Sequence, residues 1–410
     1  MDLLASYRHY WKNDPQFKSE FVRKAMSRNR FLDIMRFWHF GDNDIATDRV
    51  RKVRLWTDHL NNTMRSIYVT SEKLSLDESM MLWRGRLIFR QYIKNKRHKY
   101  GIKFFELCQH DGIVLRVSIY SGHSYDDPHG FGQSGAIVNH LMSDLLDKGY
   151  TLYADNYYNS VPLVKYFTTR QTYICGTLRN DRVDNPMEVT KAKLKRGDFV
   201  WSRSTDVVVA KWKDKRDVLT ISNKHTEPKL VPVTNRRGHE KLKPDSVKDY
   251  NLYTSGIDRT DQMLSYHSAL RKTIRWYKKV GIHMTEMYIV NAFHLYNQTR
   301  LDKMDRVTIA EFRQEVSSWL VGPLRADPRE TCTPNFHFLS VLPPTEKKER
   351  PTKPCRVCTK QKKRRETRYA CGRCSDHVAL CVDPCFRVHH CQLSNVDNIS
   401  VKNDLYKSDD

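Results

Sequence analysis

Residues 150–160, YTLYADNYYNS, place an aspartate directly after a short run that favours a β-strand. The segment that follows, SVPLVKYFTTRQ (160–171), begins like a helix, because Pro162 lies in its first turn. Asp155 is therefore predicted at the end of a strand and ahead of a helix.

The segments around this stretch alternate between strand and helix patterns. Residues 101–109 and 113–121 are β-rich and flank His-Asp-Gly, a hairpin signal. In chain order we expect strands at 74–79, 101–109 and 113–121, a helix at 134–149, a strand at 150–156, a helix at 160–171 and a strand at 172–178. This α/β order is the one that a ribonuclease-H-like core requires, with acids on the first strand, at the end of the fourth and on a later helix.

Three aspartates occupy these three places. They are Asp77 in KLSLDES, Asp155, and Asp258 in SGIDRTDQM. Two-metal phosphoryl transfer needs carboxylates that converge on a pair of Mg²⁺ ions roughly 4 Å apart. We expect Asp77 to bridge both ions, Asp155 to hold one and Asp258 to close the site. Asp261 shares a helix face with Asp258 and is either a further ligand or a helix-dipole partner.

Other acids near these positions are expected to be solvated or to cap helices; they are Glu78, Asp126 and Asp127.

The composition indicates a polyanionic partner. The 410 residues carry 71 Lys and Arg against 47 Asp and Glu, a formal net charge of +24. With 39% hydrophobic residues the chain is not of the disordered class. No apolar run of about 18 residues predicts a membrane span, and the start of the chain lacks the apolar core of a secretion signal.

The pattern divides the chain into six segments. The predicted segments are 1–71, an N-terminal helical DNA-binding or dimerisation domain; 72–180, the first part of the ribonuclease-H-like core; 181–250, a β-rich insertion; 251–324, the helical second part of the core; 325–354, a linker; and 355–391, a cysteine-rich zinc-binding domain.

Cysteines concentrate in the last segment. Seven of the 10 cysteines follow residue 350, and two Cys-x2-Cys pairs followed by a third cysteine pair form a zinc pattern. We expect two structural Zn²⁺ ions in a cross-braced module, one held by the first and third pairs and one by the second pair with His390. The expected ligands are Cys355, Cys358, Cys371, Cys374, Cys381, Cys385 and His390, with His377, His389 or Cys391 as the eighth. Metal binding would supply much of the stability of so small a module.

Two basic clusters and one further arginine are predicted to contact DNA phosphates. The predicted contacts are Lys94, Lys96, Arg97, Lys99, Arg179, Arg271, Lys272 and Arg275, with Trp276 either stacking on an unpaired base or packing in the fold. The run KQKKRR (360–365) is a candidate for nuclear import or DNA contact, and we expect a nuclear protein.

Several longer motifs resemble the piggyBac transposase family, in the same order, from about residue 20 to residue 391. They are LDESMMLWRGRLIFRQYIKNKRHKYGIKFFEL, ADNYYNSVPL, CGTLRNDR, KWKDKRDVLTISN, GIDRTDQM, RKTIRW and NAFHLYNQ. The resemblance implies a DDD transposase that is dependent on divalent metal and excises DNA at terminal inverted repeats through hairpin ends. It also implies integration at TTAA, action as a homodimer on double-stranded DNA, and a cysteine-rich tail that binds the transposon end. The family's acids map onto Asp77, Asp155 and Asp258, with Asp261 as a fourth.

The chain departs from the family in two ways. It begins inside the helical domain, without the long acidic N-terminal region that members often carry, and it has Lys96-Arg97 where members often have Lys-Pro. The short N-terminus favours a truncated gene or a domesticated DNA-binding or chromatin protein that does not cut, whereas the intact acids favour a transposase. A ubiquitin ligase or histone reader would account only for the tail.

Overall fold

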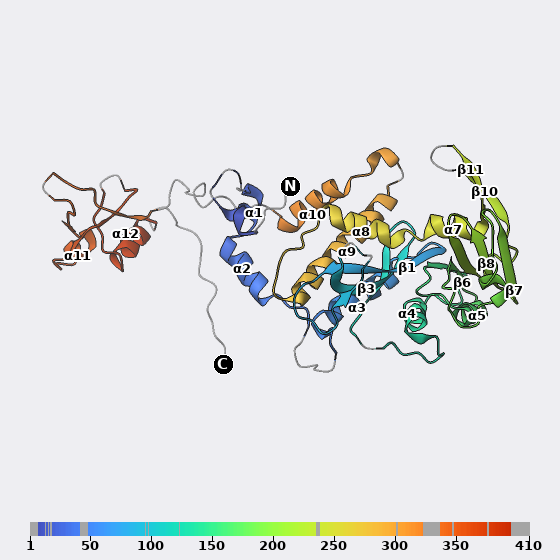
Figure 1. The fold of residues 1–410 in the computed structure, drawn as a ribbon. Coiled ribbons are helices and arrows are strands. Elements are labelled where there is room, and N and C mark those ends of the chain that lie inside the picture. Colours follow the sequence, from blue (N-terminus) through green and yellow to red (C-terminus); the bar gives the residue numbers. More distant parts are fainter. Residues whose placement is uncertain are drawn as a thin grey trace. The chain divides into compact units, whose positions relative to one another are not determined.

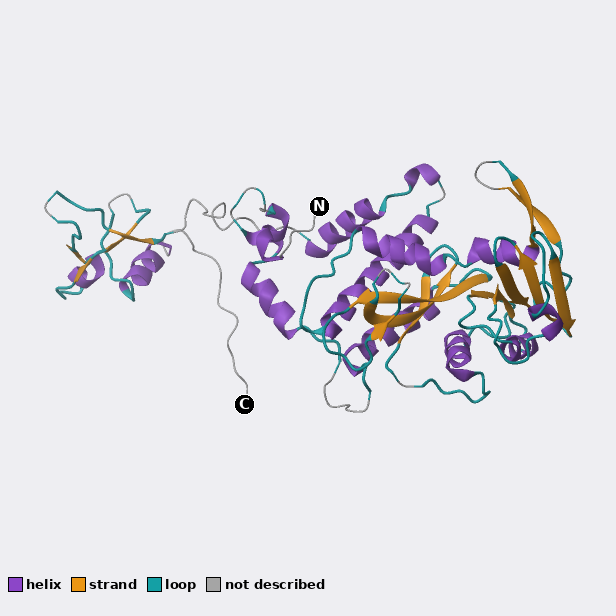
Figure 2. Ribbon diagram, viewed as in Figure 1, coloured by secondary structure: helices purple, strands orange, loops and turns teal. Residues whose placement is uncertain are grey.

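The structure is a computed structural model of the whole chain. It describes residues 7–12, 14, 16, 19–41, 48–94, 96, 98–122, 124–234, 238–300, 302–322, 337–346, 348–374 and 377–394. The chain divides into two compact units, one of Met1–Lys18 with Ser27–Gly322 and one of Ser19–Met26 with Pro323–Asp410. Figure 1 labels the elements and Figure 2 separates helices from strands.

The first unit is built on one large mixed sheet, with helices around it (Figure 2). Its strands are β1 (Lys73–Leu82), β2 (Gln91–Tyr92), β3 (Tyr100–Gln109), β4 (Val114–Ile119), β5 (Thr151–Ala154), β6 (Tyr173–Thr177), β7 (Phe199–Ser204), β8 (Val207–Lys213) and β9 (Asp217–Ser222), with a separate hairpin of β10 (Leu230–Thr234) and β11 (Glu240–Pro244). Its helices are η1 (Tyr7–Trp11), α2 (Arg28–Phe37), α3 (Arg51–Ile67), α4 (Gly132–Met142), α5 (Val161–Thr169), α6 (Met187–Thr190), α7 (Asp245–Tyr253), α8 (Gly256–Tyr266), α9 (Trp276–Gln298), η2 (Lys303–Asp305) and α10 (Ile309–Val321).

The strand order confirms the ribonuclease-H-like core. The described strands run β2-β3-β1-β5-β6-β9-β8-β7, with β4 beside β3. β1 is antiparallel to β3 but parallel to β5, and β5 is parallel to β6. A parallel neighbour requires a crossover, which α4 supplies between β4 and β5 and α5 between β5 and β6.

The predicted β-rich insertion has two parts. Strands β7, β8 and β9 extend the core sheet beyond β6 through antiparallel pairing of β9 with β6, and β10 and β11 form a hairpin of their own. The insertion is therefore β-rich, as expected, but its first part continues the core sheet.

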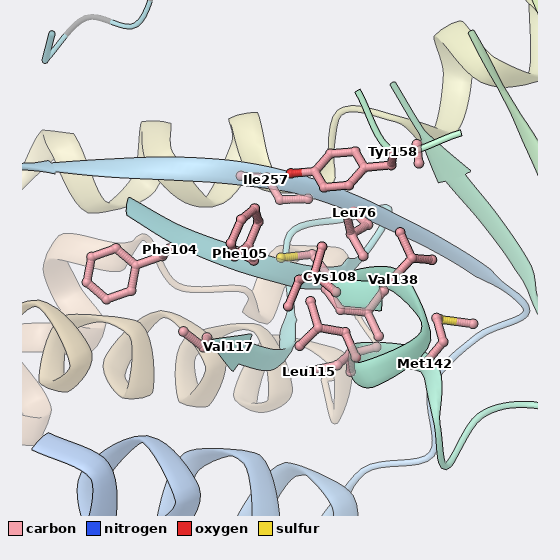
Figure 3. Close-up of a cluster of buried hydrophobic side chains, with 14 of the residues drawn as sticks. Leu76, Phe104, Phe105, Cys108, Leu115, Val117, Val138, Met142, Tyr158 and Ile257 are labelled. Carbon is pink, nitrogen blue, oxygen red and sulfur yellow. The ribbon is translucent and has the colours of Figure 1, made fainter. Parts of the chain in front are cut away.

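Successive side chains of β1 project to opposite faces of the sheet. Leu76 lies on the face of Phe105, where Tyr158 and Val138 complete a buried apolar cluster (Figure 3). Asp77 lies on the opposite face. Helices α4 and α5 lie on one side of the sheet and α7 and α8 on the other (Figure 1).

Helix α8 approaches β1 and β3 closely at its first residue. A Cβ at Gly256 would lie 2.3 Å from Ser75 Oγ and 2.5 Å from the Gln109 carbonyl oxygen. Thr260, one turn on, donates from its hydroxyl to the Gly112 carbonyl oxygen at 2.7 Å. The absence of a side chain at Gly256 thus allows the helix to sit on this face of the sheet.

The helical N-terminal part of the first unit is tied to α9. The Lys278 ammonium is buried and donates to the carbonyl oxygens of Met35 and Arg36, which lie in the last turn of α2. A lysine at this end satisfies carbonyl groups that the helix itself leaves without partners. Among the described helices, none is both long and apolar enough to span a bilayer.

The second unit contains α1 (Glu20–Ala25) and a small module with its own core. The module is built from β12 (Leu339–Val341), β13 (Lys353–Pro354), α11 (Arg356–Lys360), β14 (Glu366–Thr367), β15 (Tyr369–Cys371) and α12 (Cys385–Ser394). Strand β12 pairs with β15, so part of the segment expected to be a linker belongs to the structure of this module. The remaining segment boundaries stay predictions.

Replacing Gly256 by alanine should destabilise the first unit by about 1–3 kcal/mol, because the new methyl group must displace α8 from β1. Chemical denaturation followed by circular dichroism measures the loss. Ser265→Ala, on an exposed position of the same helix, is the control and should change stability little. Equal stability of both variants would contradict the close packing.

Candidate functional site

The parallel register of β1 and β5 brings two of the predicted acids to one end of the sheet. Leu76 pairs with Ala154, so the next residues, Asp77 and Asp155, lie side by side where β5 ends. Asp155 accepts a hydrogen bond from the backbone N–H of Tyr157 at 2.8 Å, which fixes the carboxylate in a turn.

Helix α8 contributes the other two predicted acids. Asp261 is half-buried and Asp258 is exposed, and both line a cavity of about 650 Å³ together with Lys96 from the loop after β2. The cavity continues between β1, α8 and α9, where it is lined by Met80, Leu82, Gln262, Leu264, His283 and Glu286. The Asp261 carboxylate is among the charges that raise the pKa of Lys96.

A further acid, which the sequence analysis did not single out, lies among these groups. Glu106 on β3 is the direct partner of Asp77 in the β1–β3 ladder, and its side chain is fully buried. The Ser79 hydroxyl donates to its Oε1 atom. A glutamate within the apolar run GIKFFELCQ was the available signal, because a charged residue in a strand buried on both faces is uncommon.

Lysines are the cations nearest to these acids. Lys96 Nζ lies 3.4 Å from Asp77 Oδ2 and donates to the Glu78 carbonyl oxygen at 2.6 Å. On the other face, Glu78 accepts from the Tyr158 hydroxyl at 3.0 Å and lies 3.9 Å from Lys103 Nζ. Glu78 is thus held in a network, in contrast to the expectation that it is solvated. Asp127 does cap α4, by accepting from the backbone N–H of Phe131 and of Gly132.

The protonation of the acids reflects burial and mutual repulsion. Burial raises the pKa of Asp77 to about 7, and the charges of Glu78 and Asp155 add to the rise while Lys96 opposes it. Burial raises the pKa of Asp261 to about 6, with Asp258 adding. Burial, then Asp261 and Asp77, raise the pKa of Glu106 to about 8. Such a concentration of perturbed carboxyl groups is typical of functional sites.

The donor set suits a hard divalent cation such as Mg²⁺, which prefers carboxylate oxygens. The buried Oε2 atom of Glu106 has no hydrogen-bond partner within the described part of the chain. Among the described residues, no three acidic groups have their oxygen atoms all within 4.8 Å of one another. The acids are gathered at one place, with their oxygen atoms farther apart than this spacing.

The residues predicted to contact DNA lie in different environments. Lys94, Lys99, Lys272 and Arg275 are exposed, whereas Lys96 is directed at the acids. Arg179 is exposed beside the Asp155 turn, with its guanidinium 5.5 Å from the centre of the Tyr157 ring. Arg271 is half-buried, and Arg97 lies outside the described residues.

Trp276 has a packing role in this structure. Its ring meets Phe89 edge-to-face at 5.3 Å between centroids, and the side chain is half-buried against the core of the first unit. The packing alternative for this residue therefore has direct structural support.

The first cysteine cluster in the second unit joins Cys355, Cys358, Cys381 and Cys385. The Cys358 sulfur lies 3.5 Å from that of Cys385 and 4.0 Å from that of Cys381. Zn–S bonds of about 2.3 Å around a tetrahedral ion place sulfur atoms roughly 3.8 Å apart. This cluster has the ligands and the spacing that Zn²⁺ requires, and it matches the predicted pairing of the first and third pairs.

The second cluster corrects the predicted eighth ligand. It joins Cys371, Cys374 and His390 to His337, and contains neither His377 nor His389; the side chain of Cys391 lies outside the described part of the structure. His337 Nδ1 lies 3.4 Å from the Cys371 sulfur and 3.5 Å from that of Cys374. The sequence analysis missed His337 because it precedes every cysteine pair, in a segment expected to be a linker.

The ring of His390 is oriented for metal binding. Its Nδ1 donates to the Phe386 carbonyl oxygen at 2.8 Å, which leaves the unprotonated Nε2 facing the Cys374 sulfur at 3.6 Å. Along the chain the ligands of the two clusters alternate, and this alternation is the cross-brace that the spacing predicted. Each cluster offers four Cys or His donors, a complete structural zinc site.

The first unit, with its acids at the ends of two parallel strands, defines a protein of the ribonuclease-H-like class that carries a cross-braced zinc module. The chain belongs to the piggyBac-type transposase family: residues 2–293 match the family described as Transposase IS4. Residues 342–391 match a family described as DDE_Tnp_1-like zinc finger.

Individual relatives agree with this assignment. Human PiggyBac transposable element-derived protein 3 is 26% identical over 326 residues, which are 75% of this chain and 54% of that protein. Human PiggyBac transposable element-derived protein 2 is 25% identical over 328 residues, 76% of this chain and 55% of that protein. The chain spans about half the length of these curated relatives.

A solved structure shares the fold. It is the cryo-EM structure of the piggyBac transposase synaptic complex with hairpin DNA, which matches with a TM-score of 0.66 and 24% identity over 77% of this chain and 68% of that one.

Replacing His337 by alanine should remove one zinc ion and leave the other, lowering the content from about two ions per chain to about one. Elemental analysis of purified protein measures the ratio. His389→Ala changes the same residue type outside the cluster and should keep both ions. Loss of zinc from His389→Ala but not from His337→Ala would reverse our ligand assignment.

The raised pKa of Asp77 predicts a pH-dependent stability. A carboxyl group that holds its proton more tightly in the folded chain stabilises the fold at low pH, and this contribution is lost as the pH rises through about 7. Asp77→Asn removes the effect, so in Mg²⁺-free buffer the variant should gain on the wild type between about pH 5 and pH 8. Denaturant unfolding at both values measures the difference.

Asp126→Asn, at an exposed acid, is the control for this measurement and should follow the wild type at both pH values. If the stability of Asp77→Asn relative to the wild type falls as the pH rises, the raised pKa of Asp77 is contradicted.

Proposed function

We propose that this chain is a DNA transposase that cuts and joins phosphodiester bonds at transposon ends and at TTAA targets. The observation that carries the proposal is the parallel register of β1 and β5, which sets Asp77 beside Asp155 under a helix that bears Asp258 and Asp261. Family membership and the net charge of +24 support DNA as the substrate.

In this proposal Asp77, Asp155 and Asp258 hold two Mg²⁺ ions, with Asp261 as a fourth acid. When bound, the ions activate the attacking oxygen and neutralise charge on the leaving oxygen. The chain's own groups prepare the site: the Asp155 turn fixes one carboxylate, and Lys96 pairs with Asp77. Arg179, exposed beside Asp155, is placed to contact a phosphate next to the scissile bond.

The zinc module completes the proposed assembly. Two structural Zn²⁺ ions stabilise it, and its basic run at residues 360–365 supports a role in binding the transposon end. Action on two DNA ends calls for a homodimer, and access to chromosomal DNA calls for a nuclear location. Exposed Lys94, Lys99, Lys272 and Arg275 would add phosphate contacts outside the acidic site.

A second candidate function is sequence-specific DNA binding without cutting. The human relatives are named as transposable element-derived proteins. Both candidate functions involve DNA binding, and they differ in whether the acids take part in DNA cleavage.

Asp155→Asn should abolish Mg²⁺-dependent excision of a TTAA-bordered cassette flanked by the repeats that surround this gene, because one metal ligand is lost. DNA binding should remain, since the substitution leaves the basic surfaces intact. Gel analysis of strand cleavage and a mobility shift with the repeat DNA measure the two properties separately. Asp126→Asn is the matched control and should cut like the wild type.

Full cutting by Asp155→Asn would refute the assignment of the acids. Specific repeat binding without excision by the wild type would select the non-cutting candidate, and absence of both would refute a DNA-directed function altogether.

A further inference from the structure

Glu106 occupies an unusual place for an acid. It lies in the middle of β3, a strand whose side chains are buried from Gly101 to Gln109, and no part of it is accessible to solvent. Its ladder partner is Asp77, and directly paired residues project to the same face of a sheet. Glu106 therefore faces the same side as the acid at the centre of the proposed site.

The side chain is only half satisfied. Oε1 accepts from the Ser79 hydroxyl, whereas Oε2 is buried and has no hydrogen-bond partner among the described residues. Buried polar atoms are almost always paired, so a buried carboxylate oxygen without a partner indicates a missing ligand.

The charges around Glu106 indicate what that ligand is. The charged groups that act on it most strongly are Asp261 from α8 and Asp77 from β1, both negative, followed by the cation Lys96. Lys96 is already engaged with Asp77 and with the Glu78 backbone. Lys96 acts on all three acids and also lies 3.7 Å from the Glu78 carboxylate, so negative charge exceeds positive charge around Glu106. This excess favours a cation that takes oxygen ligands.

We propose that Glu106 is a ligand of a divalent cation, which it holds together with Asp77 and Asp261. This inference rests on the proposed metal-dependent function and extends it: β3 contributes a ligand to the cation site, in addition to the acids on β1, after β5 and on α8. The occupant is a hard divalent ion of the Mg²⁺ class. Lys96 fills part of the same space and leaves when the cation binds.

Cation binding tests the proposal without using activity as the readout. The probe is Mn²⁺, whose free concentration is followed by electron paramagnetic resonance in titrations of the full, zinc-loaded chain. Glu106→Gln keeps the shape and removes the charge, and Glu106→Met is a second variant, which suits the apolar strand if the glutamine is poorly tolerated. Both should weaken Mn²⁺ binding by at least roughly 10- to 100-fold, the loss expected even for a partner of a metal ligand.

Stability gives an independent readout. Without divalent ions, and at a pH above about 8 where Glu106 is ionised, both variants should melt above the wild type, because one like charge has left a buried acidic group. The rise in melting temperature on adding Mg²⁺ should then be smaller than in the wild type. Ser79→Ala removes the hydrogen bond to Glu106 but no charge, so it should weaken Mn²⁺ binding less than either Glu106 variant does.

The outcomes separate this inference from the proposed function. If Asp77→Asn loses Mn²⁺ binding while both Glu106 variants bind like the wild type and melt below it, Glu106 has only a structural role and the inference fails alone. If the wild type binds no Mn²⁺, or Asp77→Asn binds unchanged, the metal-dependent function fails as well.

Discussion

The parallel pairing of β1 with β5 is the constraint on which the rest of this molecule depends. Side chains of paired residues project together, so the register that joins Leu76 to Ala154 also sets Asp77 beside Asp155. Parallel strands need crossovers, and α4 and α5 provide them while covering the apolar face of the sheet. The opposite face is then left for α8, whose approach at Gly256 brings Asp261 over the acids.

Bringing like charges together opposes folding, and a small number of neighbouring groups reduces the repulsion between them. Lys96 is paired with Asp77, and Lys103 and Tyr158 hold Glu78 on the far side of the strand. Burial raises the pKa of Asp77, Asp261 and Glu106, so protonation relieves part of the repulsion. The negative charge that remains is the charge that the proposed cation would neutralise.

The zinc module is stabilised by different means. Its core is small, and three of its cysteines, Cys355, Cys358 and Cys385, are among the buried residues of that core. The alternation of ligands along the chain ties distant segments to each cluster, so that neither cluster can assemble from one stretch of sequence alone. The fold of the first unit depends on strand register, whereas that of the module depends on metal ligands.

The sequence by itself determined the strand and helix order, the placement of Asp77 and Asp155 on neighbouring elements, and the cysteine pairing of the first zinc cluster. These features follow from local patterns: hydrophobic periodicity, helix-start residues and Cys-x2-Cys spacing. The tertiary structure alone decided that Glu106 faces Asp77, that Lys96 turns toward the acids and that His337 completes the second cluster. Each of these contacts depends on strand register or on the closure of a long loop, and neither leaves a periodic signal in the sequence.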